Sequence, residues 1–336
     1  MKKILALVLA LCMIFALCAC GQSAAPAASA KVKIGMVTDV GGVNDKSFNQ
    51  TSWEGLQALA KEDSRFEVNY LESKTDADYQ TNINTFIDEK YDLIISVGYM
   101  LADATRAAAE ANPDQKFAII DDDSIDLPNV ACLMFAQEQA SYLVGLVAGS
   151  VTESKTVGYV QGMVSDSMNK FGVGFISGVL AVCPDATVLQ YNANNFGDSA
   201  GGSTAAKDMI TKGADVIYHA AGGTGMGVIE ACNEEGIWAI GVDTDQSNLA
   251  PDHVITSAMK RVDVASQDIS KAVADGTFAS GVHLYDLSNG GVDLAPTRDH
   301  IPADVLTVVE QAKADIIAGK ITVPTAAADV PEFTLS

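Results

Sequence analysis

Residues 35–53 read GMVTDVGGVNDKSFNQTSW, and this stretch decides how the rest of the chain is interpreted. The apolar run 32–37 leads into it, Gly41 and Gly42 follow Thr38-Asp39, and a helical pattern starts near Ser47. The pattern predicts a strand, a polar loop and a helix. In an open parallel sheet, small ligands bind in the crevice at the carboxyl ends of the strands. The loop is therefore a candidate ligand site.

Side chains in this loop and at the start of the helix carry complementary chemistry. Asn44 and Asp45 supply an amide and an acceptor-only carboxylate, which suit hydroxyls and ring N–H groups. Phe48 and Trp53 supply flat faces for stacking. Asp, Asn and Ser are also common before helices because they cap them, so a simple capped turn is the alternative. The whole cluster favours a ligand site.

The composition is globular and strongly acidic. Among 336 residues, 48% are hydrophobic and 19% are charged, and the formal net charge is −22. This length allows two domains, each with a substantial core. So acidic a chain lacks the clustered Lys and Arg that nucleic acid requires, and it is unsuited to peripheral binding of anionic lipid.

The N-terminus has the features of an export signal. Lys2 and Lys3 precede the apolar run 4–17, which is short for a transmembrane helix. Leu17-Cys-Ala-Cys20-Gly then resembles a bacterial lipoprotein signal, with 1–19 removed and Cys20 carrying lipid. A plain secretory signal cut near Ala19 or later is the alternative. Residues 20–30, rich in Ala, Ser and Pro, are expected to form a flexible tether.

Few residues in the mature chain suggest a metal or a disulfide framework. Cys132, Cys183 and Cys232 are widely spaced, and no spacing suits zinc. Each is expected to be a small buried apolar residue. No metal site and no cofactor are predicted.

From Lys31 onward, short apolar runs alternate with helical patterns in two series of similar plan. This alternation predicts parallel strands with helices on both faces, hence an α/β fold. The expected strands are 32–37, 66–71, 93–97, 117–120, 130–134, 156–160, 187–191, 216–220, 238–242, 254–259 and 282–287. The expected helices are 47–61, 78–89, 101–111, 136–150, 167–182, 199–211, 228–235, 262–275 and 303–317, with 221–227 as a glycine-rich loop.

Five of the expected strand ends are polar or aromatic and contain Gly, Asn or Asp. They are 39–45, 98–99, 121–123, 194–198 and 243–245. If two lobes face each other, these ends line one cleft.

Several motifs together resemble the basic membrane protein family, whose members are lipoprotein substrate-binding proteins of ABC importers. The motifs are Gly35-Met-Val-Thr-Asp39, Gly42-x-x-Asp45-x-Ser47-Phe48-Asn49-Gln50, Trp53-Glu-Gly55, Ser96-Val-Gly-Tyr99, Phe135-x-x-Glu138-x-x-x-Tyr142-Leu143-x-Gly145, Gly158-Tyr-Val-Gln-Gly162, Gly213-Ala-Asp-Val-Ile-Tyr218, Ala221-Gly-Gly-Thr-Gly225, Ile240-Gly-Val-Asp243-x-Asp245-Gln246, Thr256-Ser-Ala-Met-Lys260 and Gly290-Gly-Val292. The likeness covers most of the mature chain. The best-understood members are purine nucleoside receptors.

The resemblance implies a type I periplasmic-binding-protein fold with two doubly wound parallel-sheet lobes. Three crossings join the lobes, expected near 134–136, 258–260 and 287–291. We expect residues 31–134 plus 260–287 to form the N-terminal lobe. Residues 135–259 plus 288–336 form the C-terminal lobe.

The resemblance also implies roles for particular residues. Asn44 and Asp45 would bind the base edge and the sugar, and Trp53 and Phe196 would sandwich the base. One carboxylate of 121–123 would pair with the purine ring, and alignment of the run selects Asp122. The remaining implied contacts are ribose hydroxyls to Asp243 and Lys260, and backbone groups of Gly222 and Gly223.

The implied function is therefore that of a lipid-anchored, non-enzymatic binding protein on the extracytoplasmic face of the cell membrane. Its partners would be a purine nucleoside (inosine, guanosine or adenosine) and an ABC transporter permease. Carboxylates suit ribose diols and ring N–H donors but not phosphate. The lack of a clustered basic pair beyond Lys260-Arg261 favours nucleoside over nucleotide.

Three other functions are compatible with parts of the sequence. Individual residues can also have purely structural or surface roles. Trp53 and Phe196 could be core aromatics, Lys260 and residues 121–123 could be solvated charges, and Asp243 could cap the next turn. A dinucleotide enzyme would use Gly222–Gly227 with Asp243 about twenty residues on, but GGTGMG is not G-x-G-x-x-G. The same fold could bind a sugar, riboflavin or a signalling molecule. A surface protein without a small ligand conflicts with the converging polar strand ends.

Overall fold

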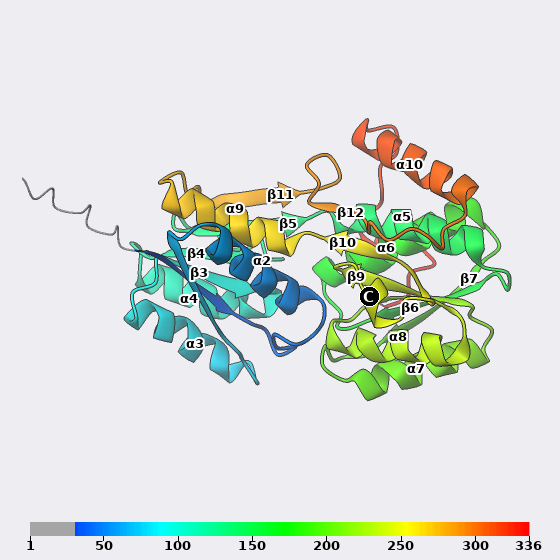
Figure 1. Ribbon diagram of the computed structural model, residues 1–336, viewed down its shortest axis with the longest axis horizontal. Helices are drawn as coiled ribbons and strands as arrows, with labels where there is room; N and C mark the ends of the chain where they lie inside the picture. Colours follow the sequence, from blue (N-terminus) through cyan, green and yellow to red (C-terminus); the bar gives the residue numbers. More distant parts are fainter. Residues whose placement is uncertain (1–30, 336) are drawn as a thin grey trace, which may run out of the picture. The chain divides into compact units, whose positions relative to one another are not determined.

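The computed structural model describes residues 31–335, and all its helices and strands belong to one compact unit that begins at Val32. Two six-stranded sheets organise this unit (Figure 1). The predicted signal peptide, the lipidated Cys20 and the tether 20–30 lie outside the described residues. No helix within 31–335 is both long enough and apolar enough to span a bilayer.

The first sheet has the strand order β11-β5-β4-β3-β1-β2, and all its neighbouring strands run parallel. Its central strand β3 is buried at every position, as expected when helices cover both faces. Helices α2 and α9 pack together on one face, and α3 and α4 lie on the other (Figure 1). We call this sheet with these four helices lobe 1. Its elements are β1 (Val32–Val37), α2 (Phe48–Glu62), β2 (Phe66–Leu71), α3 (Ala77–Asp88), β3 (Leu93–Val97), η1 (Tyr99–Leu101), α4 (Ala102–Ala111), β4 (Lys116–Ile120), β5 (Val130–Phe135), α9 (Val262–Ala274) and β11 (Gly281–Tyr285).

The second sheet has the order β12-β10-β9-β8-β6-β7 and is parallel except for β12, which pairs antiparallel with β10. Helix pairs α5/α6 and α7/α8 cover its faces, and α10 packs on α5 (Figure 1). We call this assembly lobe 2. Its elements are α5 (Gln137–Val151), β6 (Thr156–Gln161), α6 (Asp166–Val182), β7 (Thr187–Asn192), α7 (Ser199–Thr211), β8 (Val216–Ala220), α8 (Gly223–Glu235), β9 (Trp238–Asp243), η2 (Ser247–Leu249), β10 (Val254–Lys260), β12 (Val292–Leu294), α10 (Ala303–Ile317) and η3 (Ala327–Asp329).

Glycines allow α5 and α6 to pack backbone against backbone. A Cβ built on Gly145 would lie 2.3 Å from the carbonyl oxygen of Phe175, and one on Gly178 would lie 2.2 Å from that of Tyr142. Both distances are too short for real atoms. The close approach of the two helices therefore requires glycine on each side.

The chain passes between the two lobes three times, after β5, after β10 and after β11. The three passages are hydrogen-bonded to one another. Ala136 N donates to Tyr285 O at 2.9 Å, and Arg261 N donates to Gly291 O at 2.9 Å. Leu287 N donates to the Gln139 side chain at 3.0 Å. The exact lobe boundaries stay a prediction.

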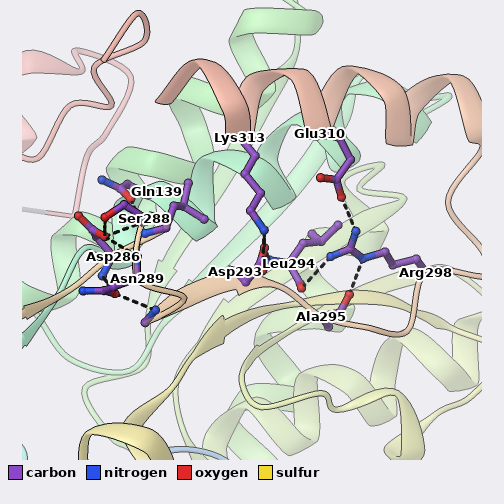
Figure 2. Close-up of polar contacts among 12 residues, drawn as sticks. Gln139, Asp286, Ser288, Asn289, Asp293, Leu294, Ala295, Arg298, Glu310 and Lys313 are labelled. Atoms are coloured by element: carbon purple, nitrogen blue, oxygen red, sulfur yellow. Dashed lines mark hydrogen bonds and ion pairs between the residues drawn. The ribbon is translucent and has the colours of Figure 1, made fainter. Parts of the chain in front are cut away.

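The turn after β11 is ordered by its own side chains (Figure 2). Asp286 Oδ1 accepts from Ser288 N at 2.8 Å and from Ser288 Oγ at 2.6 Å. Nearby, Lys313 of α10 pairs with Asp293 of β12 at 2.6 Å, and Arg298 pairs with Glu310. These pairs connect α10 to the segment that follows the third passage.

Apart from one-residue shifts at element ends and the short 3-10 helices η1, η2 and η3, the structure differs from the expected elements in three places. Helix α8 begins at Gly223, so most of the expected loop 221–227 is its first turn. Glycine disfavours helices, but a Cβ on Gly227 would lie 1.8 Å from Ser199 O, so close packing against α7 overrides propensity. Strand β11 ends at Tyr285 rather than at 287, and the short strand β12 was not expected.

Candidate functional site

Residues from both lobes line one cavity at the carboxyl ends of the parallel strands, where ligands bind in open α/β sheets. The space among its lining residues, open solvent included, measures about 490 Å³. Lobe 1 contributes Asp39, Asp45, Phe48, Asn49, Gly98, Tyr99 and Asp121. Lobe 2 contributes Met168, Phe171, Phe196, Ala220, Ala221, Gly222, Val242, Asp243 and Lys260. Polar and aromatic side chains of both lobes therefore converge on one space.

Four buried carboxyl groups surround the cavity: Asp39, Asp45, Asp121 and Asp243. Asp121 follows β4 and Asp243 ends β9, and both take left-handed backbone conformations, with φ of 68° and 65°. Such a conformation is uncommon for residues other than glycine, although Asp tolerates it better than most. Strain of this kind gathers at functional sites, where the surrounding structure enforces it.

Asp45 caps helix α2. Its Oδ1 accepts from Ser47 N at 3.0 Å and from Gln50 N at 3.1 Å, and its Oδ2 accepts from Asn49 N at 2.8 Å. Burial raises the pKa of Asp45, and these backbone bonds oppose the rise. Asp45 therefore has two roles: it caps the N-terminus of α2 and it lines the cavity, because this end of the helix points at the site.

Asp39 and Asp243 are buried carboxyl groups whose pKa values are raised. Asp39 Oδ1 accepts from Asn49 Nδ2 at 2.8 Å and from Gly41 N at 2.9 Å. Burial raises the pKa of Asp39 to about 7 against the effect of these bonds. Burial also raises the pKa of Asp243 to about 6, although the Lys260 charge and a hydrogen bond from Ser47 Oγ lower it. The Ser47 bond joins the two lobes.

Lys260 and Asp121 form a buried ion pair across the lobes, with side-chain exposures of 2% and 7%. The ammonium also lies over the rings of Phe48, Phe135 and Phe171, at 4.9, 5.1 and 5.3 Å from their centroids. Asp121 Oδ1 is buried and has no hydrogen-bond partner within residues 31–335. A buried carboxylate oxygen without a donor is costly, so Asp121 Oδ1 can accept a hydrogen bond from a molecule in the cavity.

Aromatic rings reach the cavity from both lobes. Phe48 opens α2 in lobe 1, and Phe196 lies in the loop before α7 in lobe 2. A Cβ on Gly162 would lie 2.4 Å from the Phe196 ring, so this glycine makes room for it. A Cβ on Gly41 would be 3.5 Å from Phe196 Cβ, which places Phe196 against lobe 1.

The structure brings five of the nine predicted ligand-binding residues to the cavity. They are Asp45, Phe196, Gly222, Asp243 and Lys260. Their roles toward a ligand stay predictions.

The other four predicted residues do not line the cavity. Asn44 is exposed, and Gly223 lies in the first turn of α8. Trp53 packs edge-on against Tyr70, with ring centroids 4.8 Å apart, because it lies more than one turn along α2 and over β2. Asp122 accepts from Ser124 Oγ at 2.6 Å and points into its own turn. Phe48 and Asp121 line the cavity where Trp53 and Asp122 were expected, and the ligand contacts of all four residues stay predictions.

Sequence reasoning left several lining residues out of the predicted site. Asp39, Tyr99 and Asp121 belong to the polar strand ends, so a signal for them existed. Met168 and Phe171 lie on α6 and look like core residues, so their position could not be distinguished by residue type. Within residues 31–335, no group of three or more His, Cys, Asp or Glu side chains could hold a metal ion.

Comparisons with known proteins agree with this architecture. A family model described as ABC transporter substrate-binding protein PnrA-like matches residues 31–327. The chain is 41% identical to the CD4+ T-cell-stimulating antigen of Listeria monocytogenes, over 94% of this chain and 97% of that protein. It is 38% identical to the ABC transporter nucleoside-binding protein BmpA of Lactococcus lactis, over 96% and 99%.

A solved structure supports the fold class. An ABC transporter solute-binding protein from Aeropyrum pernix K1 superposes with a TM-score of 0.81 at 26% identity, covering 88% of this chain and 95% of that one. The predicted α/β fold of the type I periplasmic-binding-protein class is confirmed.

Proposed function

Because the chain belongs to the PnrA-like family of ABC transporter substrate-binding proteins, we propose that it binds a purine nucleoside between its lobes and presents it to a membrane permease. The observation that carries the proposal is the unpartnered Asp121 Oδ1 at a cavity walled by aromatic rings. A purine nucleoside combines a flat apolar ring with N–H and hydroxyl donors. Rings can stack on Phe48 or Phe196, and donors can reach the carboxylates.

Charge supports a nucleoside over a nucleotide. The cavity wall holds four carboxyl groups, and its one ammonium is already paired with Asp121. A phosphate would face acidic groups without a free cation to neutralise it. Neutral ligands rich in donors fit this wall better, because buried carboxylates need hydrogen-bond donors.

Enclosure between two lobes supports a closing mechanism. Ligand favours the closed state only by as much as it binds that state more tightly than the open one. A permease that recognises the closed state would then receive loaded protein. Small-angle scattering that shows no compaction at saturating ligand would contradict this mechanism.

Lipidation at Cys20 would hold the protein at the extracytoplasmic face of the membrane, with 20–30 as the tether. The test is expression of the full chain and of Cys20→Ala in a bacterial host. We expect the wild type in the membrane fraction and the variant in the soluble extracytoplasmic fraction. Equal membrane association of both would refute lipid anchoring at this residue.

A thermal-shift screen of residues 31–336 tests the ligand class. Its panel contains inosine, guanosine, adenosine, cytidine, uridine, ribose, galactose, riboflavin and guanosine monophosphate. A ligand at 100 times its Kd stabilises by about 2.7 kcal/mol, which is readily seen. We expect a response to purine nucleosides and none to the monophosphate. A response to a sugar or to riboflavin instead would keep the fold and reject the proposed ligand.

A further inference from the structure

Gln246 is a buried side chain that joins the two lobes without lining the cavity. It follows β9 in lobe 2, and its Nε2 donates to the backbone carbonyl of Lys46 in lobe 1 at 2.9 Å. Lys46 lies in the loop between β1 and α2, with a left-handed φ of 55°. The contact therefore links the loop that carries Asp45 to the strand end that carries Asp243.

Lobe 2 fixes the orientation of the Gln246 amide. Its Oε1 accepts from Val242 N at 2.9 Å, and Gln246 N donates to Ser257 Oγ at 3.1 Å. Val242 N can only donate and Lys46 O can only accept, so the amide has one possible orientation. The NH2 group must face lobe 1.

His219 also holds the Gln246 amide in place. Its Nε2 is 3.0 Å from Gln246 Oε1, and since that oxygen accepts, the histidine Nε2 carries the proton. Burial lowers the pKa of His219 to about 4, so the ring is neutral at physiological pH. A Cβ on Gly241 would lie 2.7 Å from Gln246 Oε1, so a glycine is needed there as well. Lobe 2 thus holds the Gln246 NH2 group in the orientation that donates to Lys46 O of lobe 1.

We propose that Gln246 is a closure latch, a positioning residue that slows ligand release without touching the ligand. The part of this inference that concerns ligand release rests on the proposed function. A contact present only when the lobes are closed adds to the stability of the closed state alone. It therefore raises apparent affinity through the closed population, and its loss acts on dissociation.

Gln246→Glu gives a sharp test because it keeps an acceptor for Val242 N and His219 while replacing the donor that faces Lys46 O. Gln267→Glu is the matched control. Gln267 Nε2 also donates to a backbone carbonyl, that of Gly55, at 3.1 Å, but both residues lie in lobe 1. Both variants lose one side-chain donor to a backbone carbonyl, and only one contact crosses the lobes.

The first readout is the dissociation rate of radiolabelled inosine, guanosine or adenosine, whichever the wild type binds, chased with unlabelled nucleoside. A net hydrogen bond corresponds to about a 2- to 12-fold change, and a carboxylate facing a carbonyl adds repulsion. We expect dissociation from Gln246→Glu to be about tenfold faster or more, with Gln267→Glu unchanged. The urea midpoint of ligand-free Gln246→Glu should be the lower of the two, because Gln246 is buried whereas Gln267 is half-buried and lies beside Lys271. Equal dissociation rates in all three proteins overturn the latch and leave the proposed function standing.

The second readout needs no ligand. Dyes on one exposed position of each lobe, Glu67→Cys and Thr187→Cys in a Cys183→Ser background, report the closed fraction by single-molecule energy transfer. We expect Gln246→Glu to lower that fraction relative to wild type and Gln267→Glu to leave it unchanged. If the wild type binds no nucleoside, the proposed function fails, and this readout alone decides the latch. Identical closed fractions in the three proteins then overturn it.

Discussion

Asp121→Asn removes the carboxylate that neutralises Lys260, at a position where both side chains are almost fully buried. Asn is the suitable replacement because it keeps the volume and tolerates the left-handed φ of 68° at this position. The variant leaves an ammonium in a site with little water. We expect a large loss of stability.

The size of this loss can be bounded from two sides. Removing one partner of a buried ion pair costs about 3–5 kcal/mol. The cost at pH 7 cannot exceed that of discharging an ordinary lysine, which is about 4.6 kcal/mol for a group that titrates near 10.4. The rings of Phe48, Phe135 and Phe171 stabilise the cation by about 0.5–2 kcal/mol each. We therefore expect a loss of about 3–4 kcal/mol.

The assay is urea unfolding at pH 7, followed by circular dichroism and tryptophan fluorescence. Lys260→Met should cost a similar amount, because it leaves the Asp121 carboxylate buried without its partner. In the double variant neither member of this ion pair is left charged without its partner. Its loss should be smaller than the sum of the two single losses by at least about 2 kcal/mol, which a double-mutant cycle measures. Losses that add within about 0.5 kcal/mol would show that the pair is not coupled and would refute this reasoning.

Three further outcomes are expected. Phe196→Ala should weaken nucleoside binding by about 1–3 kcal/mol in calorimetry, whereas Trp53→Ala, outside the cavity, should leave the affinity unchanged; the reverse order would restore Trp53 to the site. Burial raises the pKa of Asp39 to about 7, so the folded state binds a proton that the unfolded state releases near pH 4, and this contribution to stability is lost as pH rises from 4 to 7. Asp39→Asn should therefore gain stability relative to wild type as pH rises from 5 to 8, by at most about 1.4 kcal/mol per pH unit in urea titrations, and a constant difference would contradict the shift. Gly145→Val should destabilise the protein by about 1–3 kcal/mol or more in the same unfolding assay, because its side chain meets Phe175 O, and an unchanged midpoint would mean that α5 and α6 do not pack this closely.

The alternation of strands and helices could be predicted because each element has its own apolar period. The convergence of the polar strand ends followed from one topological rule, and the structure places Asp39, Tyr99, Asp121, Phe196 and Asp243 around one cavity. At the start of α8, the low helix propensity of glycine led to the wrong prediction of a loop. There, contact with α7 outweighs the local cost, and that contact is not visible in one helix alone.

The direction in which a side chain points was harder to predict than its position along the chain. Strand β4 ends at Ile120, and the left-handed turn at Asp121 directs that residue, not Asp122, toward Lys260. A run of three aspartates contains no signal for this choice. Trp53 and Phe48 are both aromatic residues of α2, but Phe48 begins the helix and lines the cavity, whereas Trp53 packs on Tyr70. Such choices depend on neighbours distant in sequence.

Contacts between the lobes determine the chemistry of the cavity more than any single motif does. Asp45 and Asp121 of lobe 1 help raise the pKa of Asp243 of lobe 2, after burial as the larger cause. If the lobes close as proposed, closure would bring these like charges together while excluding water, which would disfavour an empty closed state. A ligand with several donors removes that penalty because its N–H and O–H groups replace the lost water. Under the proposed function, the acidic wall would select neutral donor-rich ligands and, by the same repulsion, would link closure to their presence.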